Sequence, residues 1–235
     1  MGNMLRLDET TDRFLQGTLD DIRASFVTIS HASQLIGTDL GDLLTRESAQ
    51  ALQLIESFEL AAHNQFGQLM LPLEPVALSA IVQDSLNTLW PLAKKSGVEL
   101  RLSLAGKYTP VMAHQTALLQ SMNSIGRALI EYATLSETRE PLVFGVHKTP
   151  GGIAAGVFTT QEIGEGLSAI GLRSGKALIG KAKAPIASFS SSASSGLLLA
   201  DSLLASMHTH VRIGRHGKGW GLATTLQPSR QLAIL

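Results

Sequence analysis

The sequence contains no cysteine among its 235 residues, which excludes disulfide bonds, thiolate metal sites and a cysteine nucleophile. A chain without cysteine is compatible with a reducing compartment, so we expect a cytoplasmic protein. The sequence also lacks an apolar run of about 20 residues, the length that crosses a bilayer, and its first residues are polar and acidic. We therefore expect no signal peptide, no membrane sensor and no membrane partner.

Charge is scarce and balanced. Lysine and arginine total 19, as do aspartate and glutamate, and charged residues make up 16% of the chain. A chain without net charge has no long-range field to attract nucleic acid, so we expect no nucleic-acid partner. The hydrophobic fraction of 44% and the length fit a globular protein of one or two domains.

The N-terminal part carries a heptad pattern, in which apolar residues recur at alternating intervals of four and three. This spacing predicts a helix that ends at Gly41 and Asp42, and a second helix with Thr45 as its N-cap that continues to Phe66. Residues 1–68 are thus predicted to form an antiparallel helical hairpin. The residues of the first seam are Leu15, Leu19, Ile22, Phe26, Ile29, Ile36, Leu40 and Leu43, with Ser33 at the one polar position.

A lone hairpin cannot cover an apolar stripe on each of its helices. Two chains that combine their hairpins into a four-helix bundle would bury both stripes, so we expect a homodimer. The alternative is that the stripe packs against the rest of the same chain.

Residues 69–75 contain two prolines and are predicted to be a linker to a second domain, residues 76–235. Residues 164–195 are rich in glycine, serine, alanine and lysine, which predicts a flexible loop or lid. The remaining pattern predicts a mixed α/β domain, with helices at 76–95, 116–132 and 197–207 and strands at 98–104, 142–147, 153–159, 210–213 and 220–226.

Four segments carry a resemblance to a known family. They are LPLEPVALSAIVQDSLNTLWPLAKKSGVEL at 71–100, LLQSMNSIGRALIEYA at 118–133, SSGLLLADSLLASM at 194–207 and GKGWGLATTLQP at 217–228. In this order after a hairpin, they resemble the catalytic core of two-component sensor histidine kinases. The resemblance implies an α+β protein: a hairpin that forms a dimeric four-helix bundle, then a two-layer α/β sandwich of the histidine-kinase ATPase type.

The family's phosphoacceptor segment resembles FLQGTLDDIRASF at 14–26. In this register Asp20 occupies the position of the phosphorylated histidine and Asp21 that of the adjoining acid, while Ile22 and Arg23 are retained. A carboxylate does not supply the imidazole nitrogen that carries the phosphoryl group. His31, eleven residues further along, is an alternative phosphoacceptor, although an ordinary surface histidine explains it as well.

The nucleotide-binding motifs of the family are also altered. Ala128 falls where the resemblance places the asparagine that holds Mg²⁺. Ser124 replaces the preceding polar residue of the same motif, and Asn123, one place out of register with it, is a remnant of the nucleotide site. Thr159 or Thr160 falls where an aspartate would bind adenine. An alanine offers no oxygen to Mg²⁺.

Three glycines remain as possible remnants of the nucleotide site. Gly164 and Gly166 follow the altered aspartate position, and Gly196 keeps the first glycine of the second glycine box, whereas Leu198 replaces the second. Glycine is needed there because only a residue without Cβ lets the backbone approach phosphate closely. We expect no cofactor, and no binding of Mg·ATP.

His208, His210 and His216 are close in sequence and could suggest a metal site. No carboxylate or cysteine accompanies them, so they are better explained as a solvated strand end. We expect no metal.

These observations predict a pseudo-histidine kinase, a dimeric adaptor or regulator that docks a response-regulator receiver domain or a partner kinase without transferring phosphate. The predicted docking residues are Asp20, Asp21, Arg23 and Ser30, which surround the acceptor position. The alternative is a histidine phosphotransferase that uses His31 and retains a vestigial ATPase domain. A third hypothesis, an active kinase with atypical motifs, conflicts with Ala128 and Leu198.

Overall fold

The computed structural model describes residues 9–65, 71–104, 106–135, 140–159 and 191–229. The chain divides into two compact units, residues 1–70 and 71–235. Within the described ranges, no helix combines the length and apolar character needed to span a membrane. Gly164 and Gly166, and most of the predicted loop around them, lie outside the described residues.

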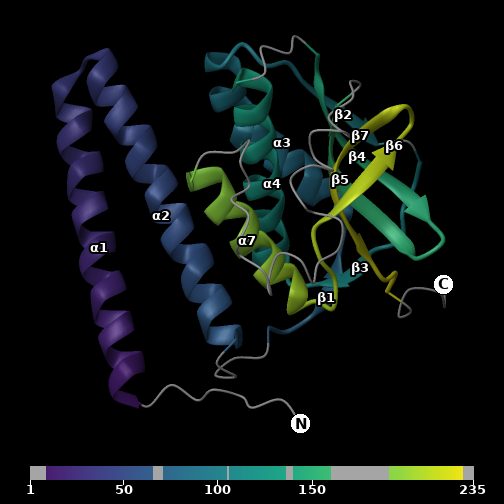
Figure 1. The fold of residues 1–235 in the computed structure, drawn as a ribbon, viewed down its shortest axis with the longest axis horizontal. Helices are drawn as coiled ribbons and strands as arrows, with labels where there is room; N and C mark the ends of the chain where they lie inside the picture. Colours follow the sequence, from purple (N-terminus) through teal and green to yellow (C-terminus); the bar gives the residue numbers. More distant parts are fainter. Residues whose placement is uncertain (1–8, 66–70, 105, 136–139, 160–190, 230–235) are drawn as a thin grey trace. The chain divides into compact units, whose positions relative to one another are not determined.

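The first unit is an antiparallel hairpin of α1 (Glu9–Ile36) and α2 (Asp39–Gln65), which lie side by side (Figure 1). The turn lies at Gly37, whose φ of +60° is a conformation that glycine adopts without strain. Thr38 then caps α2, because its Oγ1 accepts a hydrogen bond from the backbone N–H of Gly41 at 3.4 Å.

The predicted turn at Gly41 and Asp42, with Thr45 as N-cap, is therefore wrong. Thr45 lies inside α2, where its hydroxyl donates to the carbonyl of Gly41. Gly41 is needed for close packing of the two helices: a Cβ at this position would lie 2.5 Å from the carbonyl oxygen of Ser33 on α1. Apolar residues keep their spacing of three and four across the observed turn. The periodicity of the sequence therefore does not show where α1 ends.

The hairpin leaves much of its apolar surface uncovered. Between residues 15 and 62, the buried apolar side chains are Ile55 and Ala61. Eight large apolar side chains of the same range are exposed, namely Ile22, Val27, Ile29, Leu35, Ile36, Leu40, Leu43 and Phe58.

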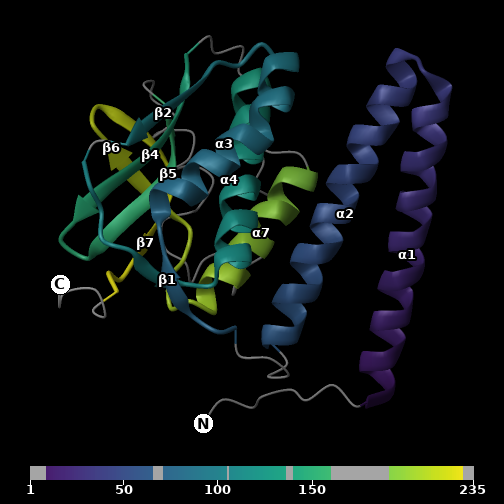
Figure 2. The same cartoon turned by 180° about the vertical axis from the view of Figure 1, so that it is seen from behind.

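The second unit has two layers, a five-stranded sheet and a layer of three helices (Figures 1 and 2). The sheet has the strand order β2-β4-β5-β7-β6; β2 and β4 are parallel and the other neighbours are antiparallel. Its strands are β2 (Leu100–Leu104), β4 (Leu142–Thr149), β5 (Gly152–Thr159), β6 (Arg212–His216) and β7 (Gly219–Leu226). The helices are α3 (Leu78–Lys95), α4 (Gln115–Leu135) and α7 (Ser191–Ala205), and α4 contacts both of the others.

A small second sheet pairs β1 (Glu74–Val76) with β3 (Val111–Ala113) in antiparallel fashion. Glu74 and Pro75, which the sequence pattern assigns to the linker, thus form part of the first strand of the second unit.

Several glycines lie on one face of the five-stranded sheet, the face away from the helices. Phe144 on β4 points toward the helices, where a Cβ on Gly126 of α4 would lie 2.9 Å from its ring. Successive residues of a strand point to opposite faces, so Gly145 belongs to the other face, which we call the outer face. The outer face also carries Gly156, Gly214 and Gly221. A Cβ at any of them would clash with a neighbouring strand, so glycine permits the close approach of the strands here.

Helix α7 corrects one prediction. The serine-rich segment up to Ser195 was predicted to be a loop, but the helix begins at Ser191. Serine is only a moderate helix former, yet Leu197, Ala200, Leu203 and Leu204 are fully buried or nearly so and fix the helix by packing. Tertiary packing therefore overrides the local composition.

Candidate functional site

Two regions carry the residues singled out from the sequence: the middle of the helical hairpin, and positions on α4, α7 and the end of β5 in the second unit. We describe each within its own unit.

In the hairpin, Arg23 connects the two helices. One guanidinium nitrogen is 3.0 Å from Oδ1 of Asp20, one turn earlier on α1, and the other bonds Glu59 on α2. The hydrogen bond to Glu59 raises the pKa of Arg23 above its usual value, and Asp20 and Glu56 add smaller favourable charge interactions. The side chain of Asp20 is 69% exposed, so the acceptor position presents a carboxylate to solvent.

The structure brings together only some of the predicted docking residues. Asp20 and Arg23 are paired, and Asp21 is exposed beside them. Ser30 is half-buried and lies roughly 15 Å further along α1, given a rise of about 1.5 Å per residue. Sequence reasoning missed Glu59, because its pairing with Arg23 depends on a hairpin register that was predicted from the wrong turn.

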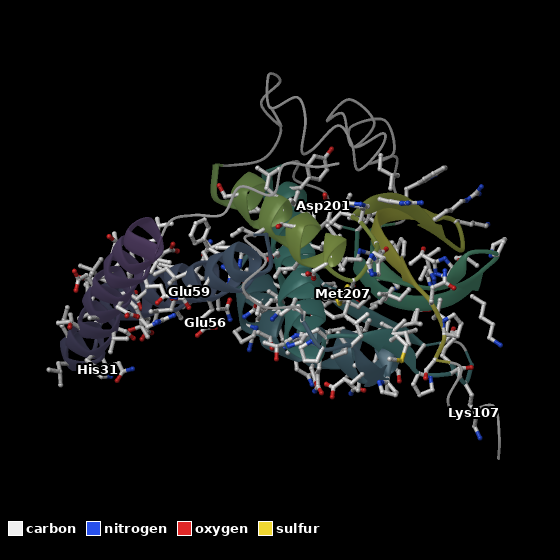
Figure 3. The ribbon with its side chains drawn as sticks, turned by 90° about the horizontal axis from the view of Figure 1, so that it is seen from below. His31, Glu56, Glu59, Lys107, Asp201 and Met207 are labelled. Carbon is white, nitrogen blue, oxygen red and sulfur yellow. The ribbon has the colours of Figure 1, made fainter. Side chains whose placement is uncertain are left out.

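His31 is exposed on α1 and lies toward the turn of the hairpin, away from Glu56 and Glu59 (Figure 3). It is about 16 Å along the helix from Asp20. Its imidazole therefore does not take part in the charged group around Arg23.

On α4, Ala128 lies on the side that faces α7. Ser121, seven residues earlier and on the same side, places its Oγ 3.3 Å from the carbonyl oxygen of Ala200 on α7. Ala128 is fully buried, so this position supplies a methyl group and no oxygen ligand. Asn123 lies about 140° around the helix from Ala128, and its buried Oδ1 has no hydrogen-bond partner in the described part of the chain.

On α7, Gly196 and Leu198, which the resemblance compares with a glycine box, lie inside the helix. Gly196 is buried in the second turn, and Leu198, which is 43% exposed, follows it. A helix leaves only its first four N–H groups without an intrahelical partner. From Ser195 onward, the N–H groups of α7 are therefore directed to carbonyls of the preceding turn.

At the end of β5, Thr159 is 2% exposed and pairs with Trp220 of β7. Thr160, the alternative residue at the adenine position, is outside the described ranges. The position that the resemblance compares with an adenine-binding aspartate is therefore a buried threonine.

Solved structures share this arrangement of hairpin, sheet and helices. The structure of full-length ShkA in complex with AMPPNP superposes with a TM-score of 0.60 and 16% sequence identity, covering 92% of this chain and 47% of that one. The Acinetobacter baumannii histidine kinase AdeS superposes with a TM-score of 0.52 and 13% identity, covering 88% of this chain and 97% of that one. The fold is that of a histidine-kinase catalytic core.

The predicted order of a helical hairpin and a two-layer α/β domain, and the resemblance to histidine-kinase cores, are thereby confirmed. The dimeric four-helix bundle stays a prediction. No family model matches the sequence, and no curated protein matches it. The chain spans about half the length of ShkA and nearly the whole of the AdeS chain. At these identities the likeness concerns the histidine-kinase-like fold alone.

The three C-terminal histidines, His208, His210 and His216, do not form one cluster in the structure. His208 is exposed, with a φ of +58°. Nδ1 of His210 is 3.3 Å from Oδ2 of Asp201, a carboxylate that sequence reasoning did not place near it. Asp201 is 1% exposed, and its Oδ1 accepts a hydrogen bond of 2.8 Å from the backbone N–H of Val211.

His216 instead lies on the outer face of the sheet with His147, which the sequence analysis did not single out. Burial lowers the pKa of both imidazoles, and the charge of His216 lowers that of His147 further. In the described residues, no group of three or more histidine, cysteine, aspartate or glutamate side chains is placed to hold a metal ion.

Proposed function

We propose that this chain is a pseudo-histidine kinase: a dimeric adaptor or regulator that keeps the kinase shape and docks a response-regulator receiver domain or a partner kinase. The observation that carries the proposal is the position of Gly196 and Leu198 within α7.

Phosphate binding at a helix start requires free backbone N–H groups and a backbone that the ligand can approach closely. The N–H groups around Gly196 are committed to the helix, and the exposed side chain of Leu198 stands where the second glycine would be. The methyl group of Ala128 adds to this argument, because Mg²⁺ is held by oxygen ligands. Both changes act against nucleotide binding.

The hairpin supports the dimeric part of the proposal. Its eight exposed large apolar side chains need a cover, and a second hairpin would supply one with matching chemistry. Burying a leucine or isoleucine contributes about 1.5–3 kcal/mol, so a few such residues suffice for a stable bundle.

The charged group of Asp20, Arg23 and Glu59 supports the docking part. Asp20 keeps a negative charge at the acceptor position, and Arg23 holds its side chain next to α2. A receiver domain that recognises this region through complementary charge would meet a fixed surface rather than a mobile one.

The second candidate is a histidine phosphotransferase that uses His31. The exposure of His31 on α1 favours it, because a phosphoacceptor imidazole must be reached by a partner. Incubation with a phosphorylated receiver domain distinguishes the two candidates. If the chain acquires an acid-labile phosphoryl label that His31→Gln does not acquire, the chain is a phosphotransferase and the adaptor proposal is wrong. If the chain acquires no label, the adaptor proposal stands.

The central test is a titration of the purified chain with Mg·ATP, followed by calorimetry and by thermal unfolding. A ligand at a hundred times its dissociation constant stabilises the folded state by about 2.7 kcal/mol, so real binding is easily visible. We expect no saturable heat and no shift of Tm up to millimolar nucleotide. Saturable binding would overturn the pseudokinase and reopen catalysis.

The docking surface is tested with the receiver domains encoded in the same genome. Asp20→Ala should weaken the binding of a cognate receiver about fivefold, since a partly exposed charge pair contributes about 1 kcal/mol. Asp84→Ala is the matched control, because Asp84 is an exposed carboxylate on α3. Equal loss in the two variants, or in neither, would argue against docking at the acceptor position.

A further inference from the structure

The outer face of the sheet assembles three polar side chains from three strands, on the side away from α4 and its neighbours. They are Ser103 on β2, His147 on β4 and His216 on β6. Strands β2 and β6 are the two ends of the sheet, so a contact between Ser103 and His216 requires the sheet to curl over its outer face. Gly145 permits this, because a Cβ there would lie only 3.1 Å from the His216 ring.

The three side chains form a continuous chain of hydrogen bonds. Nε2 of His216 is 2.9 Å from Oγ of Ser103, and Nδ1 of His216 is 3.1 Å from Nδ1 of His147. Both rings pack against the ring of Phe158, which is 1% exposed. The centroid of the Phe158 ring is 5.1 Å from that of His216 and 5.8 Å from that of His147. The two imidazoles are therefore held in place by an apolar support beneath them.

We propose that His147 and His216 form a binding site for a divalent transition metal ion, which sits between their Nδ1 atoms. With metal–nitrogen bonds of about 2.0–2.1 Å, two ligating nitrogens are about 2.9 Å apart in a square-planar ion and about 3.4 Å apart in a tetrahedral one. The observed separation of 3.1 Å lies between these values. Little movement of either ring is needed.

Ser103 has a defined part in this site. When its Oγ accepts a hydrogen bond from Nε2–H of His216, the Nδ1 of His216 is left as a lone pair that faces His147. A metal-bound histidine commonly donates its other N–H to an oxygen in this way, which fixes both tautomer and ring orientation. In this tautomer of His216, and without metal, Nδ1–H of His147 donates to that lone pair.

Metal binding is balanced in protons. The ion takes the place of the proton on Nδ1 of His147, and that ring then carries its proton on Nε2 instead. Both rings stay neutral, and no proton is released overall. Burial, which lowers the pKa of both rings, favours the same neutral form. Water completes the coordination, because both side chains are only half-buried.

The same contacts resemble a serine activated by a histidine, but the third group does not suit that chemistry. A nucleophilic serine works with an imidazole that becomes positively charged and is stabilised by a carboxylate. Here the second ring nitrogen of His216 faces another imidazole. Metal binding uses the observed pair directly.

The test uses the full chain without a histidine tag, stripped with a chelator and exchanged into buffer. We expect one Cu²⁺ ion per chain, with nitrogen hyperfine structure from two equivalent imidazoles in the electron paramagnetic resonance spectrum. Calorimetry with Ni²⁺ and Zn²⁺ should give weaker binding at the same site, as expected from the usual order of affinities.

Four variants make the test decisive. His147→Gln and His216→Gln should each abolish the two-imidazole signal, and Ser103→Ala should weaken binding about tenfold through loss of the supporting hydrogen bond. His31→Gln, which changes an exposed histidine of the hairpin, should bind as the unmodified chain does.

Retention of the signal in either His147→Gln or His216→Gln would overturn the proposal, as would its loss in His31→Gln. Circular dichroism of each variant checks the fold. If His216→Gln does not fold, because its ring covers Phe158, the result for His147→Gln decides alone.

Discussion

The hairpin and the second unit differ in how completely each covers its own apolar side chains. The hairpin exposes eight large apolar residues in a run of fewer than 50, whereas the described part of the second unit exposes four, Trp90, Leu102, Leu198 and Trp220. The second unit closes a core around Phe144, Leu118, Met122 and Ile125 within one chain. The hairpin has the helical pattern but little of its own core, so its stability should depend on a partner.

The largest effect is expected in the second unit, when the largest buried side chain on the helix-facing side of its sheet is removed. Phe144→Ala should lower the free energy of unfolding by about 3–5 kcal/mol, because it leaves a cavity beneath α4. Both tryptophans, Trp90 and Trp220, lie in the second unit, so urea titration followed by tryptophan fluorescence reports on that unit. Phe58→Ala in the hairpin is the control and should hardly move this transition. A loss below about 1 kcal/mol for Phe144→Ala would contradict the assigned core.

The dependence of the hairpin on a partner is tested by measuring the oligomeric state of the chain. Ile29→Asp places a charge within the exposed stripe and should weaken dimerisation about 10- to 100-fold, the loss of one buried side chain. Sedimentation equilibrium over a range of concentrations measures this. Leu198→Asp changes an exposed leucine of the second unit and should leave the dimer intact. If the unmodified chain is a monomer at all concentrations, the dimeric four-helix bundle is wrong.

Within the second unit, Asp201 ties the end of α7 to the start of β6. Asp201→Ala leaves the buried N–H of Val211 without its acceptor and should cost about 1–3 kcal/mol. Asp201→Asn keeps an acceptor oxygen and should cost clearly less. Equal costs in urea titrations would show that the carboxylate charge, rather than the hydrogen bond to Val211, is what matters.

The smallest effect concerns pH. Burial lowers the pKa of His147 and His216 in the folded state, so the unfolded chain binds more protons at intermediate pH. The contribution of the pair to stability is complete above the unfolded pKa of about 6.5 and declines as pH falls through that value toward the folded pKa values. The Tm of the second unit should therefore fall between pH 7.5 and 5.5. His147→Gln should show a shallower fall, and an unchanged slope would contradict the assignment.

The order of elements could be predicted because each amphipathic helix and alternating strand carries its own periodicity. Two boundaries could not. The apolar seam runs in step through Gly37 into Leu40 and Leu43, so the pattern alone places the turn too late. The serine-rich start of α7 has the composition of a loop and becomes helical through its packing.

The site residues divide in the same way. Positions compared with a linear motif, such as Asp20, Ala128 and Leu198, follow from sequence resemblance, and their roles stay predictions. The partners Glu59 and His147 could not be identified in this way, because Arg23 meets Glu59 over 36 positions and His147 meets His216 over 69. The first contact depends on the exact turn of the hairpin, and the second on how far the sheet curls. Neither is encoded in a local pattern.

The contact between Ser103 and His216 also bears on the order of folding. It joins residues 113 positions apart, whereas α1 and α2 meet across a two-residue turn. Contacts of large sequence separation form slowly, because loop-closure entropy is lost before they contribute. The contacts within the hairpin can thus form early, once a partner covers its apolar side chains, while the outer face closes only after β6 has been added to the sheet. Until that last step the His216 ring does not cover Phe158, so burial of the Phe158 ring marks completed folding of this face.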